Sequence, residues 1–386
     1  MYQTEFLPLL KLHLKSCKFL QCVPFEFPQN SSRLVKCQSL SKIRMFKLQC
    51  ILSVLYCTLF GLNLCFGPLT KIEKFQGFGF FMCYLLASIT RWNYELDNGP
   101  SQLINAFLDC EETIMTSFPQ MSCSLACQVV KLFIQLCEVG VVTFPMLLFL
   151  LLRVMPCTPP FLLSFLPGCH NGSDICTFGH LGRLGVHIFE AWMCDHIVYS
   201  ATTWILYVFC AGIIFILDFL RVLESNLTRH STSEKYSESI QLYRNIQILE
   251  KSWNACLSER ILPAIMFCNP AVEIISTFVC ITLSKEIPMP GFLIFPIMAA
   301  ASLTNNMVII TLASRVHSAS RDLLTSLKQL KLEKRSKLMR KELQACNTLR
   351  IKFGSNFIDN GTPLVMQDVC INQIMSLVLL KRSRVN

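Results

Sequence analysis

Three polar residues near the carboxyl end of the chain, Asp368, Asn372 and Ser376, follow one another at intervals of four and would share one face of a helix. Their neighbours are apolar enough for that helix to cross a membrane, where a polar face must contact protein or water. Several copies of the helix around an axis would line a pore, with a ring of carboxylates that attracts cations. Leu379 or Leu380 would then form an apolar constriction that gates by dewetting. The alternative is a polar face that packs against neighbouring helices.

Two other predicted spans carry a carboxylate, Glu138 and Glu273, and a charge inside a bilayer usually faces a partner or water. Aromatic residues also cluster in the outer halves of several spans. A pocket for a small apolar ligand is aromatic with few polar groups, so such a cluster is a candidate ligand site. The alternative roles are structural hydrogen bonding and helix packing. The ligand-binding candidates are Phe81, Tyr84, Glu138, Phe144, Tyr199 and Trp204.

Four of the 21 cysteines fall in a segment expected outside the cell: Cys157, Cys169, Cys176 and Cys194. The outer side is oxidising, so we expect disulfides among them, in any of the three possible pairings. Asn171 in the same segment begins an Asn-Gly-Ser sequon and is the expected glycosylation site. Neither a catalytic motif nor a metal-ligand spacing is present, so no enzyme, metal or other cofactor is predicted.

The elements that position these residues are membrane-spanning helices. Hydrophobic residues make up 52% of the 386 residues and charged residues only 16%, which excludes a soluble globular enzyme and a disordered chain. Seven stretches approach the roughly 20 apolar residues that a spanning helix needs. The second is short and needs Arg91 and Trp92 as interfacial anchors. The stretches are residues 48–68, 74–91, 132–152, 197–217, 261–283, 292–312 and 363–380.

Positive charge predicts the orientation. With a cytosolic amino terminus, 26 of the 35 Lys and Arg residues lie in cytosolic segments and 8 lie outside, as the positive-inside rule requires. We therefore predict an all-α, polytopic membrane protein of seven transmembrane helices with a cytosolic amino terminus and an extracellular carboxyl terminus. The net charge of +10 then reports membrane orientation and no nucleic-acid partner.

This topology divides the chain into four regions. Residues 1–47 form a cytosolic segment, and residues 48–312 form a six-helix ligand-binding region with a large external loop at 153–196. Within that loop, residues 182–195 favour a short helix leading into the fourth span. Residues 313–362 form a cytosolic helical anchor, and residues 363–386 form the last helix and a short external tail.

The segment that enters the last span carries a recognisable pattern. Residues 351–357 read Ile-Lys-Phe-Gly-Ser-Asn-Phe, an apolar-Lys-apolar-Gly-x-x-Phe arrangement, and a helix start with Thr362 and Pro363 follows. Together with the size, the topology and the polar last span, this pattern resembles the arthropod chemoreceptor superfamily, the insect-type odorant and gustatory receptors. The gustatory signature of Thr-Tyr, five hydrophobic residues and Gln-Phe is absent, so we assign a divergent gustatory-like member.

The resemblance implies a ligand-gated, non-selective cation channel in the plasma membrane, opened by small odorants or tastants. Its partners would be the small-molecule ligand, membrane lipid and related receptor subunits in a homo- or heterotetramer. Each subunit would bind ligand among helices two to six, the last helices would line one pore, and the cytosolic helices would hold the subunits together. The alternatives are a polytopic transporter, whose internal symmetry the sequence does not show, and a G-protein-coupled receptor, whose orientation the charge distribution opposes.

We predict that epitope tags at the two ends stain differently because the charge distribution places the ends on opposite sides of the membrane. The carboxyl-terminal tag should stain on intact cells, and the amino-terminal tag only after permeabilisation. Glycosidase should shift the electrophoretic mobility of the wild type but not of Asn171→Gln. Staining of the amino-terminal tag on intact cells would contradict the topology.

Overall fold

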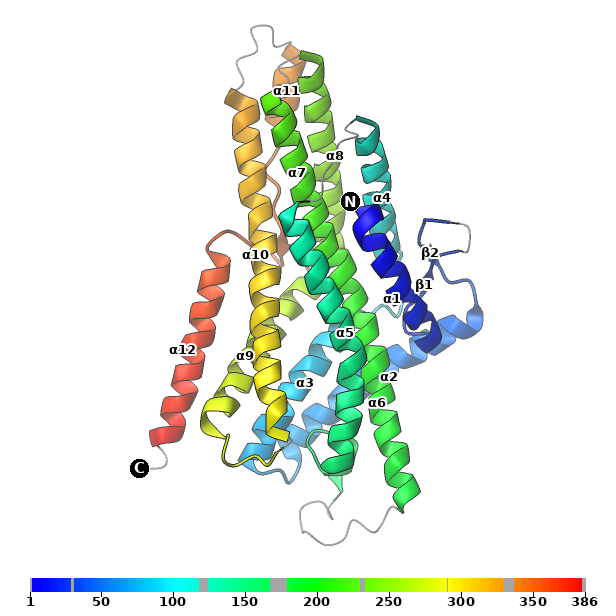
Figure 1. The fold of residues 1–386 in the computed structure, drawn as a ribbon, viewed down its shortest axis with the longest axis vertical. Coiled ribbons are helices and arrows are strands. Elements are labelled where there is room, and N and C mark those ends of the chain that lie inside the picture. Colours follow the sequence, from blue (N-terminus) through cyan, green and yellow to red (C-terminus); the bar gives the residue numbers. More distant parts are fainter. Residues whose placement is uncertain are drawn as a thin grey trace.

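The computed structural model describes residues 2–28, 31–117, 124–166, 179–229, 233–289, 291–329 and 337–383 of the chain. Long helices run side by side and give the molecule an elongated shape (Figure 1). The strands of the described residues form two short antiparallel hairpins: β1 (Phe25–Glu26) with β2 (Val35–Lys36), and β3 (Lys352–Phe353) with β4 (Asn356–Phe357). The predicted helical class is therefore the observed one.

Six helices in the described part of the chain are long and apolar enough to cross a membrane. Each covers most of one predicted span, and several extend well beyond it. The π-helical segment Thr203–Cys210 joins α6 and α7 into one continuous helix. The six are α2 (Leu40–Phe66), α5 (Leu125–Val154), α6 (His180–Thr202) with α7 (Ala211–Arg229), α9 (Ile261–Thr282), α10 (Ile294–Gln329) and α12 (Thr362–Ser383).

The predicted second span is the helix α3 (Lys71–Arg91), which is not among these six. A capping box fixes its start, because Thr70 Oγ1 accepts the Glu73 N–H at 3.3 Å and the Glu73 carboxylate accepts the Thr70 N–H at 2.7 Å. The helix packs against α2, α6 and α9. It approaches α2 so closely that a Cβ on Gly77 would lie 2.6 Å from a Leu64 methyl group. A helix with neighbours on several sides exposes less surface to lipid, which fits its modest hydropathy.

Helix α6 begins earlier than the sequence predicts. The region expected as an external loop, residues 153–196, is helical from His180 onward, and the short helix expected at 182–195 is part of α6. Before it, a 3₁₀ turn covers Leu162–Phe165. The buried Glu190 carboxylate of α6 accepts the backbone N–H of Leu162 at 2.7 Å. This contact fastens α6 to the turn and keeps the segment inside the bundle.

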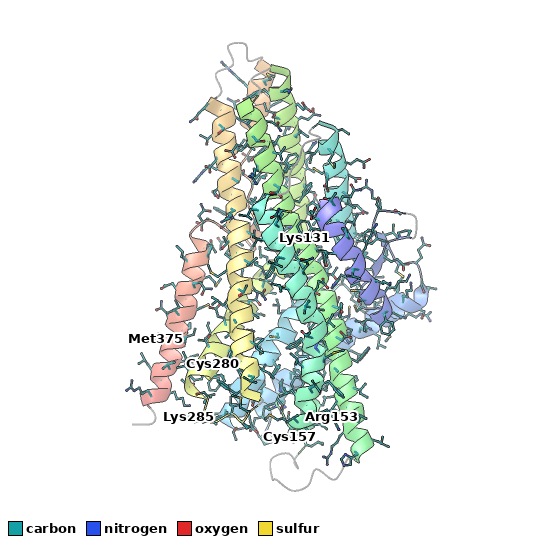
Figure 2. All side chains as sticks on the ribbon, in the orientation of Figure 1. Lys131, Arg153, Cys157, Cys280, Lys285 and Met375 are labelled. Carbon is teal, nitrogen blue, oxygen red and sulfur yellow. The ribbon has the colours of Figure 1, made fainter. Side chains whose placement is uncertain are left out.

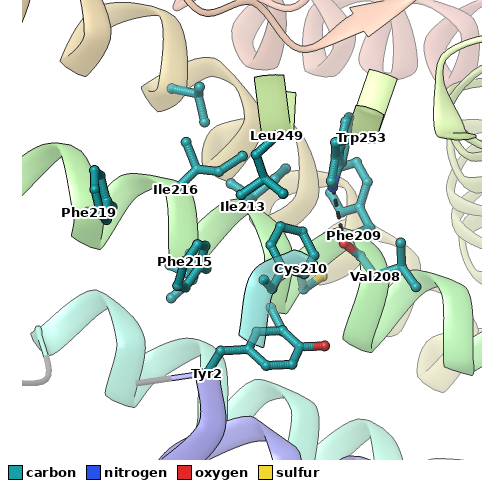
Figure 3. Packing of buried hydrophobic residues seen from close by; sticks show 14 of the residues in the cluster. Tyr2, Val208, Phe209, Cys210, Ile213, Phe215, Ile216, Phe219, Leu249 and Trp253 are labelled. Atoms are coloured by element: carbon teal, nitrogen blue, oxygen red, sulfur yellow. Dashed lines mark hydrogen bonds between the residues drawn. The ribbon is translucent and has the colours of Figure 1, made fainter. Parts of the chain in front are cut away.

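Beyond the spans, α7, α8 (Ser233–Leu257), the second half of α10 and α11 (Lys337–Ala345) extend together at the top of Figure 1. We call this part the helical extension. Its core contains the fully buried Trp253, whose indole N–H donates to the Val208 carbonyl at 3.1 Å (Figure 3). Helices are thus present in the predicted anchor segment, while α8 was not predicted.

The amino-terminal segment folds onto the bundle. A π-helical turn, Tyr2–Phe6, continues into α1 (Leu7–Leu20), and α4 (Gly99–Ser117) packs against this turn. The fully buried Tyr2 donates its hydroxyl hydrogen to the Tyr207 carbonyl at 3.1 Å. The sequence did not predict α1 or α4, because neither is long or apolar enough to stand out from a polar segment.

Helix α12 lies at one edge of the bundle, beside α9 and α10 (Figure 1). Only 11% of the most apolar stretch of this helix is buried against the rest of the chain. Pro363 and Cys370 are the buried residues of this helix among those described. The last helix therefore has one contact face and a much larger uncovered surface.

We predict that Gly212→Ala destabilises the protein. A Cβ at Gly212 in α7 would lie 2.7 Å from the Phe107 ring and 3.2 Å from Trp253 Nε1. Overpacking of this kind costs about 1–3 kcal/mol, against about 1 kcal/mol gained from replacing a helical glycine. The melting temperature of the purified protein should therefore fall.

Gly140→Ala in α5 is the matched control, because nothing lies within 4 Å of a Cβ at that position. It receives the same gain in helix propensity without a clash, so its melting temperature should stay unchanged or rise. Equal melting temperatures for the two variants would show that α7 does not pack as closely as described.

Candidate ligand cavity and pore helix

A cavity of about 290 Å³ lies among α3, α5, α6, α9 and α10. Its wall is mostly apolar and includes two aromatic rings, Phe80 and Phe144. A concave, apolar wall with a few polar groups is the usual form of a site for a small organic molecule. The polar residues of the wall are Thr202, Asn269, Ser302 and Asn305.

Two prolines inside helices adjoin this cavity. Pro145 follows Phe144 in α5, and Pro270 follows Asn269 in α9. Proline has no backbone N–H, so each helix lacks one hydrogen bond next to the cavity. The two helices are therefore weakened where a bound molecule would touch them.

Of the six predicted ligand-binding residues, Phe144 lines this cavity. Phe81 lines a separate groove between α2 and α3. Tyr84 is buried in an aromatic cluster, with its ring centroid 5.5 Å from that of Tyr56, and Trp204 is buried in the main core. The structure does not bring the predicted set together, because residues at a similar depth lie on different faces of the bundle.

Glu138 and Tyr199, the other two predicted ligand residues, join α1 to the bundle. The Glu138 carboxylate lies 2.9 Å from His13 Nδ1 and accepts the Tyr207 hydroxyl at 2.8 Å. His13 Nε2 lies 3.0 Å from the Tyr199 carbonyl oxygen. These contacts match the structural hydrogen bonding that the sequence left open as the alternative role for Glu138.

Arg91, expected as an interfacial anchor, is 0% exposed, whereas its neighbour Trp92 is 37% exposed. The Arg91 guanidinium contacts the His196 ring nitrogen Nδ1 and lies 3.4 Å from Gln49 Oε1. The anchoring role thus does not hold for Arg91. This pairing is not evident from the sequence, because neither partner is a carboxylate.

A polar cluster connects the cavity to α12. Glu273 on α9 is 5% exposed, and its Oε2 accepts hydrogen bonds from Asn306 at 2.6 Å and Gln367 at 3.4 Å. Asn269, one turn before Glu273, and Asn305, next to Asn306, both line the cavity. Helices α9 and α10 therefore both line the cavity and, through Glu273 and Asn306, form the polar cluster that contacts α12.

The polar stripe of α12 faces away from the rest of the chain. Asp368, Asn372 and Ser376 are exposed, and Asn372 donates to the Asp368 carboxylate at 3.2 Å. The opposite side of the helix carries Gln367 and the buried Cys370 and faces α9. The alternative in which this stripe packs against other helices of the same chain therefore does not apply among the described residues.

The two candidate constriction residues have different surroundings. Leu379, 59% exposed, lies only about 20° around the helix from Asp368, because each residue turns by about 100°. Leu380 lines a cavity of about 600 Å³ that α12 shares with α3 and α9. At its edge Lys381 forms an ion pair with Glu286 at 2.8 Å. The geometry favours Leu379 as the residue that shares the polar face.

Residues 351–357, which carried the family-like pattern, form the hairpin of β3 and β4 before α12. Gly354 has a φ of 54°, a left-handed conformation that favours glycine. Its N–H donates to the Ser258 carbonyl at 2.7 Å, and the Lys352 N–H donates to Asn254 Oδ1 at 2.9 Å. The hairpin thereby fastens the start of α12 to α8 and the residue just after it.

A turn at Asp359 sets where α12 begins. The Asp359 carboxylate accepts the Thr362 hydroxyl at 2.7 Å and the backbone N–H groups of Gly361 and Thr362 at 3.1 and 3.0 Å. Hydrogen bonds from Thr362 hold the pKa of Asp359 below its ordinary value. This carboxylate therefore stays ionised and keeps its hydrogen bonds at neutral pH.

The predicted disulfide residues behave differently from one another. Cys157 is disulfide-bonded, and Figure 2 shows it with Arg153 and Lys285 at the end of the bundle where α12 also ends. Cys194 is a free, buried thiol, so its predicted place in an external disulfide does not hold. The reason is that α6 begins before Cys194 and carries it into the core. Cys169, Cys176 and Asn171 lie outside the described residues.

The geometry defines a helical membrane protein with an apolar cavity between its helices and an uncovered polar face on its last helix. No family model matches the chain, and no match is found among curated proteins. Solved structures do match. The olfactory receptor OR5 of Machilis hrabei in complex with eugenol aligns with a TM-score of 0.66 and 14% identity, over 98% of this chain and 100% of that one.

A second structure of the same receptor aligns over the same shares at 14% identity, with a TM-score of 0.61. The chain therefore has the fold of an insect olfactory receptor along almost its whole length. The resemblance to the arthropod chemoreceptor superfamily is thus confirmed at the level of the fold. The assignment to a gustatory-like branch stays a prediction.

Proposed function

We propose that the chain is a subunit of a chemosensory, ligand-gated, non-selective cation channel in the plasma membrane. The observation that carries this proposal is the uncovered polar stripe of α12, in a chain that has the fold of insect olfactory receptors. Several copies around one axis would enclose water along Asp368, Asn372 and Ser376. Following the family resemblance, we propose four copies, identical or mixed with related subunits.

The proposed topology counts α3 as the seventh span, packed against α2, α6 and α9. The amino terminus and the helical extension would lie in the cytosol, and the end that carries Arg153 and Lys285 would lie outside (Figure 2). The helices α7 and α10 continue beyond their apolar, membrane-spanning parts into the helical extension. Following the family resemblance, we propose that this extension holds the subunits together.

The proposed ligand is a small, mostly apolar organic molecule with one or two hydrogen-bonding groups. A cavity of about 290 Å³ limits its size. Phe80 and Phe144 would pack against the ligand, and Asn269 or Thr202 would bond its polar group. The complex of the Machilis receptor with eugenol supports a ligand of this class.

The proposed gating route runs through Glu273. A ligand opens a channel only if it binds the open state more tightly than the closed state. Movement of α9 or α10 around a ligand would displace Asn306 and Glu273 together, because they are joined at 2.6 Å. Gln367 would pass this displacement to α12 through its contact with Glu273.

We predict that Ala301→Phe, which places a large ring in the cavity, reduces ligand sensitivity. Ala301 lines the cavity from α10, so a phenyl ring there would occupy space that the ligand needs. The agonist concentration for half-maximal current should rise at least about tenfold, the effect of losing about 1.4 kcal/mol of binding free energy. Dose-response recordings from expressing cells provide the measurement.

Ala300→Phe is the matched control, because Ala300 is exposed on the same helix and is not part of the cavity wall. It should leave the dose-response curve unchanged. Surface labelling must show equal amounts of both variants. The cavity is not the ligand site if Ala301→Phe responds as the wild type does.

We predict that Asp368→Asn lowers cation conductance or alters divalent block, because it removes a ring of negative charge from the pore. Ligand sensitivity should stay nearly unchanged. Leu379→Gln should raise the current without ligand, because a polar constriction no longer dewets. Single-channel and whole-cell recordings, with any co-receptor present, measure both effects.

Two variants serve as controls for the pore. Asp322→Asn removes an exposed carboxylate from the helical extension. Leu380→Gln changes a leucine that lines the cavity shared by α12, α3 and α9, about 120° around the helix from Asp368. Neither should change conductance or basal current as the pore variants do. A responsive receptor in which Asp368→Asn and Leu379→Gln behave like the wild type would show that α12 does not line the pore.

A further inference from the structure

A second, larger hollow lies on the outside of the bundle. It is a groove of about 740 Å³ between α2 and α3, separate from the ligand cavity. Val54 and Leu62 of its wall are 42% and 48% exposed, so the groove opens towards the surrounding membrane. Apart from Thr58, Ser88 and a single arginine, its wall consists of apolar residues and one glycine.

The groove exists because one wall lacks a side chain. A Cβ on Gly61 of α2 would already lie 3.4 Å from the Phe81 ring of α3. Phe81 and its neighbour Phe78, with ring centroids 6.1 Å apart, form the opposite wall. Any larger residue at Gly61 would fill the space between the helices.

One end of the groove is cationic and aromatic. Arg260, the residue before α9, lines this end, and its buried Nε has no hydrogen-bond partner among the described residues. Trp92 lies at the same end and stacks on Tyr94 at 5.9 Å between ring centroids. Lys47 lies over the Tyr94 ring, 4.7 Å from its centroid. Asp97 attracts Arg260, but no ion pair joins them among the described residues.

The dimensions and chemistry of this groove suit a lipid. From Phe78 to Trp92 the helix rises about 21 Å, which is longer than one leaflet of a hydrocarbon core of about 30 Å. Tryptophan prefers the level of the lipid headgroups. The Arg260 guanidinium lines the groove, and a guanidinium is a strong hydrogen-bond donor for phosphate oxygens. A neutral sterol would fill the apolar part but would leave the charge of Arg260 unbalanced.

We propose that this groove binds an anionic phospholipid, with an acyl chain between α2 and α3 and the phosphate on Arg260. The end of the groove at Arg260 lies in the cytosolic leaflet if the proposed topology holds. That leaflet is the one that carries the anionic lipids. The opposite face of α3, with Phe80 and Ala87, lines the ligand cavity. The bound lipid and the ligand would therefore contact the same helix from two sides.

Lipid binding to the full-length protein, purified in detergent, tests the proposal by native mass spectrometry. The protein is titrated with phosphatidylserine or with phosphatidylcholine of the same acyl chains. We expect tighter binding of phosphatidylserine to the wild type. Arg260→Gln should weaken phosphatidylserine binding about tenfold, the scale of a lost hydrogen bond to a charged group. It should weaken phosphatidylcholine binding less, because the choline cation already balances the charge of that phosphate. Gly61→Leu should weaken the binding of both lipids.

Arg315→Gln is the control, because Arg315 is an exposed arginine on α10 and does not line the groove. It should bind both lipids as the wild type does. Equal binding of the two lipids by the wild type would overturn the proposal, and so would unchanged phosphatidylserine binding by Arg260→Gln.

The readout is bound lipid and not current, so this proposal and the channel proposal can fail separately. A protein that conducts ligand-gated current but binds both lipids alike would refute only the lipid site. A protein that binds phosphatidylserine through Arg260 but forms no channel would refute only the proposed function.

Discussion

A polar helix face cannot remain in contact with hydrocarbon, and this constraint on α12 determines how the molecule can sit in a membrane. One side of the helix contacts α9 and α10, while Asp368, Asn372 and Ser376 face outwards. Burying a carboxylate in lipid is costly, so protein or water must cover this stripe. Copies of the chain that share one water-filled axis satisfy the constraint, and a single copy does not.

Three other polar or charged side chains inside the bundle have partners within the chain. Glu138 is paired with His13, Glu273 with Asn306, and Arg91 with His196. Each pair joins helices that are distant in the sequence, so the same contacts that solvate polar groups also hold the fold together. The polar stripe of α12 differs from these pairs because it is exposed. The Glu273 cluster links α12 to the cavity wall.

Much of the fold could be predicted, because long apolar stretches of the sequence mark spanning helices. The polar stripe of α12 could also be predicted, because its residues are spaced four apart. The rotation of each helix could not be predicted, because its packing partners set it. Phe144 and Phe81 were grouped by depth, yet they line different hollows. Helices α1, α4 and α8 were missed because packing stabilises them more than their own composition does. The burial of Arg91 could not be predicted because its partners, His196 and Gln49, are not carboxylates and do not mark an ion pair in the sequence.

A cryo-EM reconstruction of the full-length protein in a lipid nanodisc tests the central claim most directly. The account predicts a particle with fourfold or pseudo-fourfold symmetry, with α12 closest to the axis and Asp368, Asn372 and Ser376 facing a continuous lumen. A monomeric particle, or an assembly in which α12 lies on the lipid-facing rim, would contradict it.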